Sequence, residues 1–418
     1  MTTWLSQQGM DDGKLPSLTG ARWWAALAVF VLHALVFLPV YPFQKSETFR
    51  TIHAFVPMQL GAGGVTFFFV LSGFVIFWSY RRRGSVGRYY QRRLLKIFPT
   101  HIVTGVVLVL IAGVPLVRPV VWAPNLLLLH TWIPKWSTVG GLNVPSWSLC
   151  AELLFYLTFP LALPVVSRIP SVRLWWAMGV LFIVIIGLHT GFYLWADGPK
   201  GTDNLFVPRL LPGDVSPEFE IHVSPRWFEQ TDIPVSMSYW LSYSFPASRL
   251  PEFYVGVLAA RLVAEGMWRT TRLTAPLTAL AVSYGATWIV PVNYKLSVLM
   301  VAPMAAVIAT MAVRDLRGLP GICATRPMVR LGEISFAFYM IQFPVMVAVT
   351  RTFIGGHRYS LGGWLVWTAL SLVVSILAAA AIYYGVDQPL MARLARRPHH
   401  LGEAPVAGQP SAKLRARP

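Results

Sequence analysis

The sequence predicts an all-α, polytopic integral membrane protein with about ten transmembrane helices and both termini in the cytoplasm. Of the 418 residues, 55% are hydrophobic and only 12% are charged. Apolar runs of about 20 residues recur along the whole chain, and this is the length that crosses a hydrocarbon core about 30 Å thick. Lys and Arg gather in alternate connecting segments, which sets the N-in, C-in orientation.

The apolar runs place the ten spans in one membrane domain, residues 21–390. The cytoplasmic ends, 1–20 and 391–418, are predicted to be disordered because they are rich in Gly, Pro and Arg. The first run is full length, which favours a retained helix over a cleaved signal peptide. The predicted spans are 22–41, 58–80, 97–117, 146–167, 174–196, 239–260, 274–292, 296–313, 332–350 and 362–386.

The net charge of +18 could suggest a nucleic-acid partner, but the distribution of charge argues against one. Most of the 35 Lys and Arg residues fall in predicted cytoplasmic segments or at span edges, where the positive-inside bias explains them. The basic tail is expected to contact membrane lipid. No two histidines have metal-ligand spacing on one helix, so no metal site is expected. The sequence leaves the oligomeric state open.

Arg22 and His33 are an unusual pair on the first span. They stand eleven positions apart, which is about three helical turns and about 16 Å along one helix face. Arg22 is predicted to lie at the cytoplasmic surface and His33 near the bilayer midplane. An ionisable side chain at that depth indicates a functional site. The spacing suggests a phosphate-bearing donor at the surface whose reactive end reaches a buried base.

A second cationic group precedes the third span in the segment RRRGSVGRYYQRRLLKIFP. Arg92, Arg93 and Lys96 stand at positions i, i+1 and i+4, and two of the three share a helix face. Guanidinium groups suit bidentate phosphate binding. The alternative is an ordinary positive-inside loop, which is the favoured interpretation for Arg81, Arg82 and Arg83.

The fourth span begins with polar residues in the segment NVPSWSLCAELLFYLTFP. Trp147, Ser148, Glu152 and Tyr156 form a polar patch on an otherwise apolar helix, and Asn143 or Ser146 could cap its start. A buried carboxylate needs a partner or a changed pKa. Glu152 is therefore either part of a structural ion pair or a group that orients His33 or an acceptor hydroxyl.

Other spans carry isolated small or polar residues. Ser72 and Gly73 on the second span allow close approach of a helix or a ligand. Tyr339 is one of several polar positions on the ninth span. Arg249 and Glu252 on the sixth span are close enough in sequence to pair, and this pair is predicted to be structural.

Two long connections differ from ordinary loops. Residues 118–145 contain a short apolar stretch, WAPNLLLLHTWIP, which is too short to cross a membrane and predicts an interfacial or re-entrant helix. Residues 197–238 form a long polar segment of the kind that often serves as a lid or a binding element.

Together, four of these motifs resemble the acyltransferase 3 family, the membrane O-acyltransferases of bacterial glycans and macrolide-type antibiotics. LTGARWWAALAVFVLHA carries that family's pairing of Arg22 with His33, and GVTFFFVLSGF looks like its second-span signature. RRLLKIFP and WSLCAELLFY are similar to its third-span and fourth-span signatures. The chain departs from the family pattern at Lys96, where an arginine is usual, at Gln342, where a histidine is usual, and at Asp387, where a glutamate is usual.

The resemblance implies a multi-pass enzyme of the bacterial plasma membrane that uses acyl-CoA as co-substrate and holds no permanent cofactor. Arg93 and Lys96, with Arg22 and the adjacent Arg92, would hold the donor phosphates. His33 would act as general base or carry the acyl group transiently, and Glu152 would orient it or the acceptor. The acceptor would be a glycan sugar or a macrolide-type metabolite. Residues predicted to contact substrate are Ser72, Trp147, Ser148, Tyr156 and Tyr339.

One alternative belongs to a different class of protein. A transporter or flippase could move an acyl group or a glycan without forming an ester, and His33 would then be a proton relay. The sequence shows no internal repeat, which mildly disfavours the inverted-repeat transporter folds.

Overall fold

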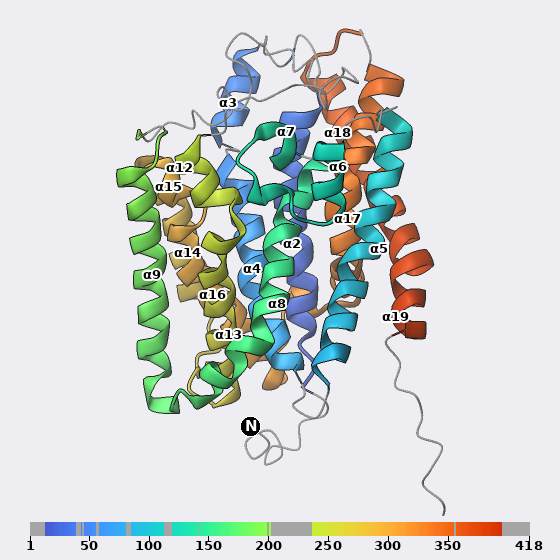
Figure 1. The fold of residues 1–418 in the computed structure, drawn as a ribbon. Helices are drawn as coiled ribbons and strands as arrows, with labels where there is room; N and C mark the ends of the chain where they lie inside the picture. The colour runs from blue at the N-terminus through green and yellow to red at the C-terminus, as the bar shows by residue number, and fades with distance from the viewer. Residues whose placement is uncertain are drawn as a thin grey trace, which may run out of the picture.

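The computed structural model describes residues 13–394, except for 39–42, 44–45, 56–57, 81–84, 113–118, 141, 199, 202–235 and 355–356. Every regular element in this part of the chain is a helix, and no strand occurs in it. In Figure 1 the helices stand side by side as a bundle, with α9 at one edge and α18 and α19 at the other. The all-α class predicted from the apolar runs is confirmed.

Eight of the predicted spans coincide with helices that are long and apolar enough to cross a membrane. In lipid the backbone polar groups must be satisfied within the segment, so long apolar runs fold as continuous helices. These helices are α2 (Pro16–Phe37), α4 (Met58–Ser79), α5 (Val86–Ala112), α8 (Trp147–Arg168), α9 (Leu174–Trp195), α16 (Val298–Leu316), α17 (Arg326–Val349) and α18 (Leu361–Ile382).

The other two predicted spans, 239–260 and 274–292, are helical but not continuous. The first is divided into α12 (Met237–Tyr239), η5 (Trp240–Ser244), η6 (Pro246–Arg249) and α13 (Leu250–Ala264). The break falls at Pro246, which has no backbone N–H to continue the helix. The second is α14 (Thr274–Ala286) with η7 (Thr287–Ile289), and 13 residues rise only about 20 Å. Among the described residues, eight of the ten predicted spans are therefore helices long enough to cross a membrane.

The predicted interfacial stretch 118–145 is a series of short helices at one end of the bundle (Figure 1). Its His130 is buried, with Nδ1 3.3 Å from Cys150 Sγ, and burial lowers the pKa of this histidine to about 3. Of the predicted lid, 197–238, most lies outside the described residues.

The remaining short elements are α3 (Glu47–Phe55), α6 (Pro119–Leu126), η2 (His130–Trp132), α7 (Trp136–Val139), η3 (Val144–Ser146), η4 (Ser171–Arg173), α15 (Val292–Lys295), η8 (Ile322–Ala324), η9 (Thr350–Ile354), η10 (Tyr383–Asp387) and α19 (Gln388–Leu394).

The first helix begins earlier than predicted. Ser17 donates from its backbone N–H and its hydroxyl to the carboxylate of Asp315, at 2.8 and 2.5 Å. This contact stabilises a helical turn that precedes the apolar run, so 16–20 are helical. The helix also ends at Phe37, before the predicted end at 41, so His33 lies one turn before the end of α2 and not at the middle of the helix. At the other end of the chain α19 continues to Leu394, past the predicted start of the tail.

The predicted caps of the fourth span are not made by side chains. Ser146 occupies the N-cap position of α8, but no side-chain capping bond is formed there. Its hydroxyl accepts from Asn125 Nδ2 at 3.0 Å. Asn143 donates to the backbone carbonyl of Met340 at 3.0 Å. Both residues therefore join α8 to neighbouring segments.

Small residues bring α4 and α13 into close contact, as the second-span pattern predicts for Gly73. A Cβ atom at Gly73 would collide with the carbonyl of Phe253, and one at Gly256 would collide with the carbonyl of Val70. The two helices approach so closely that only glycine fits at each crossing point.

Gly73→Ala is expected to lower the free energy of unfolding by about 1–3 kcal/mol, because the added methyl group forces the two backbones apart. The measurement is thermal unfolding of the purified protein in detergent. Gly179→Ala is the matched control, since a Cβ at Gly179 on α9 meets nothing within 4 Å. Equal melting temperatures for the two variants would contradict this account of the α4–α13 contact.

Candidate active site

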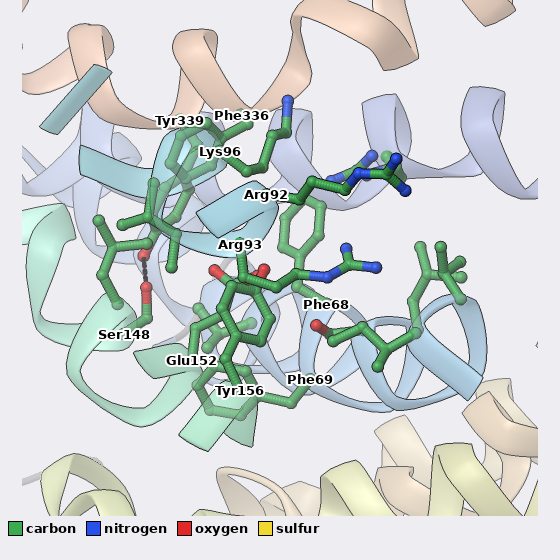
Figure 2. A pocket seen from close by; sticks show the side chains of 18 of the residues that line it. Phe68, Phe69, Arg92, Arg93, Lys96, Ser148, Glu152, Tyr156, Phe336 and Tyr339 are labelled. Atoms are coloured by element: carbon green, nitrogen blue, oxygen red, sulfur yellow. Dashed lines mark hydrogen bonds between the residues drawn. The ribbon is translucent and has the colours of Figure 1, made fainter. Parts of the chain in front are cut away.

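A cavity of about 240 Å³ opens among α2, α4, α5, α8, α17 and α19. Figure 2 shows basic side chains on one side of it and the hydroxyl groups of Ser148 and Tyr339 on the other. Nine of the eleven predicted site residues line it, although they come from five separate helices. They are Arg22, Ser72, Arg92, Arg93, Lys96, Ser148, Glu152, Tyr156 and Tyr339.

Arg93 is held at the cavity by aromatic rings. Its guanidinium carbon lies 5.5 Å from the centroid of the Tyr89 ring and 5.7 Å from that of Tyr156. Its Nη2 donates to Ser79 Oγ at 3.3 Å, while its buried Nε has no hydrogen-bond partner among the described residues. Stacking on two rings fixes the plane of the guanidinium and leaves a donor for an anion.

Lys96 lies between two aromatic rings that the sequence analysis did not single out. Its Nζ is 5.5 Å from the Phe336 ring centroid and 5.8 Å from that of Tyr383. Phe336 stands three positions before Tyr339, so it shares the cavity-facing side of α17. That spacing was the signal that could have identified it.

Charges of both signs surround Lys96. Arg22, Arg93, Glu152 and Asp387 all interact with it electrostatically. Asp387 accepts a hydrogen bond from Thr100 Oγ1 at 2.6 Å, and its other carboxylate oxygen is buried without a partner in the described part of the chain. Two carboxylates therefore offset part of the charge of three cations, which leaves the basic side of the cavity with net positive charge.

Ser148, Glu152 and Tyr156 lie on one face of α8 at positions i, i+4 and i+8. The Tyr156 hydroxyl donates to Glu152 Oε1 at 2.5 Å. Ser148 Oγ and Tyr339 OH are 2.9 Å apart. Both hydroxyls are also within donating distance of the carbonyl of Pro145, Tyr339 at 2.9 Å and Ser148 at 3.3 Å, so either of them can supply the proton between the two.

Trp147 does not line the cavity, in contrast to its predicted role in substrate contact. Because it precedes Ser148 by one position, its side chain leaves α8 in a different direction. Its ring lies 4.5 Å from that of Tyr243 and 6.4 Å from that of Phe69, centroid to centroid. Trp147 therefore packs behind Phe69, which is itself part of the cavity wall.

The predicted pair of Arg249 and Glu252 is confirmed, with Nη2 3.1 Å from Oε2 and both side chains buried. The same guanidinium donates to Thr66 at 3.0 Å and lies 5.2 Å from the Phe69 ring centroid. The pair is thus behind the cavity wall, in agreement with a structural role.

His33 is the other predicted residue that does not line the cavity. Its ring makes an edge contact with Phe37 at 5.0 Å, and its Nδ1 is buried without a hydrogen-bond partner among the described residues. Gln342, where the resembled family usually has histidine, donates to the Tyr339 carbonyl at 3.0 Å. The structure therefore joins Arg22 to the other cations but leaves His33 outside the cavity they line.

Comparisons with known proteins agree with this arrangement. The acyltransferase domain family matches residues 15–384, which includes every residue discussed for the cavity except Asp387. This chain belongs to the acyltransferase 3 family. It is therefore a membrane acyltransferase.

Two relatives extend over most of this acyltransferase. Acyltransferase MdmB of Streptomyces mycarofaciens is 33% identical over 92% of this chain and 93% of its own length. Nodulation protein 10 of Rhizobium leguminosarum bv. viciae is 25% identical over 80% of this chain and 83% of its own length. No solved structure matches the chain significantly.

Proposed function

We propose that this protein is an acyl-CoA-dependent O-acyltransferase of the bacterial plasma membrane. It transfers a short acyl group to a hydroxyl of a macrolide-type metabolite or of a glycan sugar. The observation that carries the proposal is the convergence of cations from α2 and α5 on one cavity with Glu152 and the Ser148–Tyr339 hydroxyl pair. Membership of the acyltransferase 3 family supports the reaction class.

The size and charge of the cavity suit the narrow arm of acyl-CoA. Pockets that enclose drug-sized ligands usually measure about 300–1,000 Å³, and this cavity measures about 240 Å³. It can therefore take the pantetheine arm but not the nucleotide. Arg92 is exposed, and with Arg22, Arg93 and Lys96 it would hold the phosphates at the entrance.

The proposed chemistry is direct transfer between the thioester and a hydroxyl. The acceptor oxygen attacks the thioester carbonyl, and His33 takes the hydroxyl proton as general base. The carbon–sulfur bond breaks, an ester bond forms, and the CoA thiolate leaves and takes up a proton. Ser148 and Tyr339 bind the reacting end of the donor. Glu152 and Tyr156 lie between these two hydroxyls and the cations.

The position of His33 adds a condition to this mechanism. Because His33 does not line the donor cavity, the acceptor is the substrate that meets it first. The thioester in the donor cavity reaches the acceptor beside His33 only if these two places connect when both substrates are bound. Neighbouring hydroxyls on Ser148 and Tyr339 mark the end of the cavity where that connection would form.

The decisive experiment is acyl transfer by the purified protein. Acetyl-CoA or propionyl-CoA is incubated with a macrolide or a glycan acceptor, and intact mass and free CoA thiol are both measured. The expected result is a gain of one acyl group on the acceptor with release of one thiol. Binding of CoA without thiol release for any acceptor would favour the transporter or flippase instead.

Lys96→Arg is expected to leave the KM for acyl-CoA unchanged or to lower it by several-fold. Arginine keeps the charge and the contacts with the rings of Phe336 and Tyr383, and it adds a bidentate fork for phosphate. Steady-state kinetics with varied donor measure the effect. A large rise in the donor KM would indicate that the site requires the compact ammonium group.

A further inference from the structure

A second cavity of about 510 Å³ lies between α2, α4, α14 and α16. It shares no lining residue with the active-site cavity. On α4 the two are lined by different positions, since Gly63, Gly64 and Phe67 line this groove while Phe68 and Phe69 line the active site. We refer to it as the lateral groove.

The floor of the lateral groove is a row of apolar side chains on α16, most of them methionines. Met300, Met304, Val307 and Met311 line it at spacings of four, three and four residues, so they share one helix face. Eleven residues of helix rise about 16 Å, which is about half of a hydrocarbon core about 30 Å thick. Methionine side chains adapt their shape to an apolar partner. The groove therefore has the length of one lipid acyl chain and an adaptable surface.

The edge of the groove faces away from the bundle. Trp24 is 50% exposed and Leu277 is 49% exposed, and both line the groove. On a membrane-spanning protein, apolar side chains at such positions contact lipid. The groove can thus be filled from the bilayer.

One amide side chain, Gln59, lines this mostly apolar groove. Gln59 is 0% exposed, and neither its Nε2 nor its Oε1 has a hydrogen-bond partner among the described residues. A buried amide without hydrogen bonds costs free energy, so we expect a bound molecule to supply its partner. Gln59 is the second residue of α4, a helix long enough to span a hydrocarbon core, so we expect its first turn at the membrane interface, where the ester groups of phospholipids lie.

We propose that the lateral groove binds one membrane phospholipid. One acyl chain lies along the methionine face of α16, and the ester carbonyl of that chain accepts a hydrogen bond from Gln59 Nε2. The site is separate from the acyl-transfer site and does not depend on the proposed function.

The first test fills the groove. A Cβ at Gly63 meets only the flexible ends of Met300 and Met304, at 3.1 Å or more, so Gly63→Leu is expected to fold and to occupy the groove. Gly179→Leu is the matched control, because Gly179 faces open space on α9. Native mass spectrometry of the detergent-solubilised full chain with added phosphatidylglycerol should show one retained lipid for the wild type and the control. Gly63→Leu should reduce that occupancy at least tenfold, and equal occupancy in all three proteins would overturn the proposal.

The second test identifies the polar contact. Phosphatidylglycerol with ester-linked chains is compared with its ether-linked analogue of the same chain length. The wild type should prefer the ester several-fold, on the order of the two- to tenfold effect of one net hydrogen bond, and Gln59→Leu should remove the preference. Equal affinity of the wild type for both lipids would overturn the role of Gln59.

A third measurement needs no substitution. Cys323 lines the groove and is a free, half-buried thiol, whereas Cys150 is free and buried. Bound phosphatidylglycerol should slow alkylation of Cys323 by a maleimide at least several-fold, as followed by peptide mapping, with Cys150 as the slow internal reference. No change in the Cys323 rate on addition of saturating lipid would overturn the proposal, even if Gly63→Leu failed to fold.

Discussion

His33→Ala is expected to lower the rate of acyl transfer by about 10²–10⁴-fold, the usual contribution of a general base. Its Nδ1 is buried without a partner in the described part of the chain, so truncation breaks no hydrogen bond seen there. The melting temperature should therefore stay close to that of the wild type. The measurement is kcat for acyl transfer to the acceptor, with thermal unfolding of the same preparation.

His357→Ala is the control for this experiment. His357 is exposed, and its Nδ1 is 3.2 Å from the local backbone carbonyl of Ile354, so its loss should leave kcat unchanged. Turnover of His33→Ala within a few-fold of the wild type would remove His33 from the mechanism. A loss of turnover together with a fall in melting temperature would point to a packing role, since the His33 ring contacts Phe37.

Arg93→Ala is expected to weaken CoA binding by about 10- to 100-fold, because a hydrogen bond to a charged group contributes about 1.5–3 kcal/mol. The guanidinium is positioned by the rings of Tyr89 and Tyr156, so the alanine variant loses a charge whose geometry was already fixed. Calorimetric titration with CoA measures the donor affinity, and kinetics with varied acceptor measure the other substrate.

The matched control is Arg88→Ala on the same helix. Arg88 is exposed and does not line the cavity, so it should keep the affinity for CoA within about twofold if only local charge matters. An equal loss of donor and acceptor affinity in Arg93→Ala would show that Arg93 supports the cavity rather than binding the donor. In that case the melting temperature should also fall, because the variant loses the contacts of Arg93 with the rings of Tyr89 and Tyr156.

The membrane class and the long helices follow from local properties of the chain. An apolar run of about 20 residues folds as a helix in lipid whatever surrounds it, because its backbone must be satisfied within the segment. The cavity residues were also recognisable one helix at a time, because a charge such as Arg93 or Glu152 at the edge of an apolar helix is costly without a function. Apolar wall residues such as Phe336 carry no charge and were missed, and only the three-residue spacing from Tyr339 could have indicated Phe336.

Contacts between distant segments decided the rest. Ser17 bonds to Asp315, which is 298 positions away, and this bond moves the start of α2 and the place of His33 along it. Asn143 and Ser146, which could have capped α8, instead bond to Met340 and Asn125. Whether a side chain caps its own helix or joins another depends on which partner is near, and the local sequence does not specify this.

The arrangement of distant segments also determines which predicted residues line the active-site cavity and which do not. The sequence by itself determined an all-helical membrane protein and its polar candidates, because hydrophobic length and unusual charge are properties of single helices, and the acyltransferase class came from the resemblance of its motifs to a known family. Only the tertiary structure decided that Arg22 joins Arg93 and Lys96, that Trp147 lies behind Phe69, and that His33 lies outside the cavity. Each of these depends on how a helix is rotated against its neighbours, and that rotation is set by packing across the whole bundle.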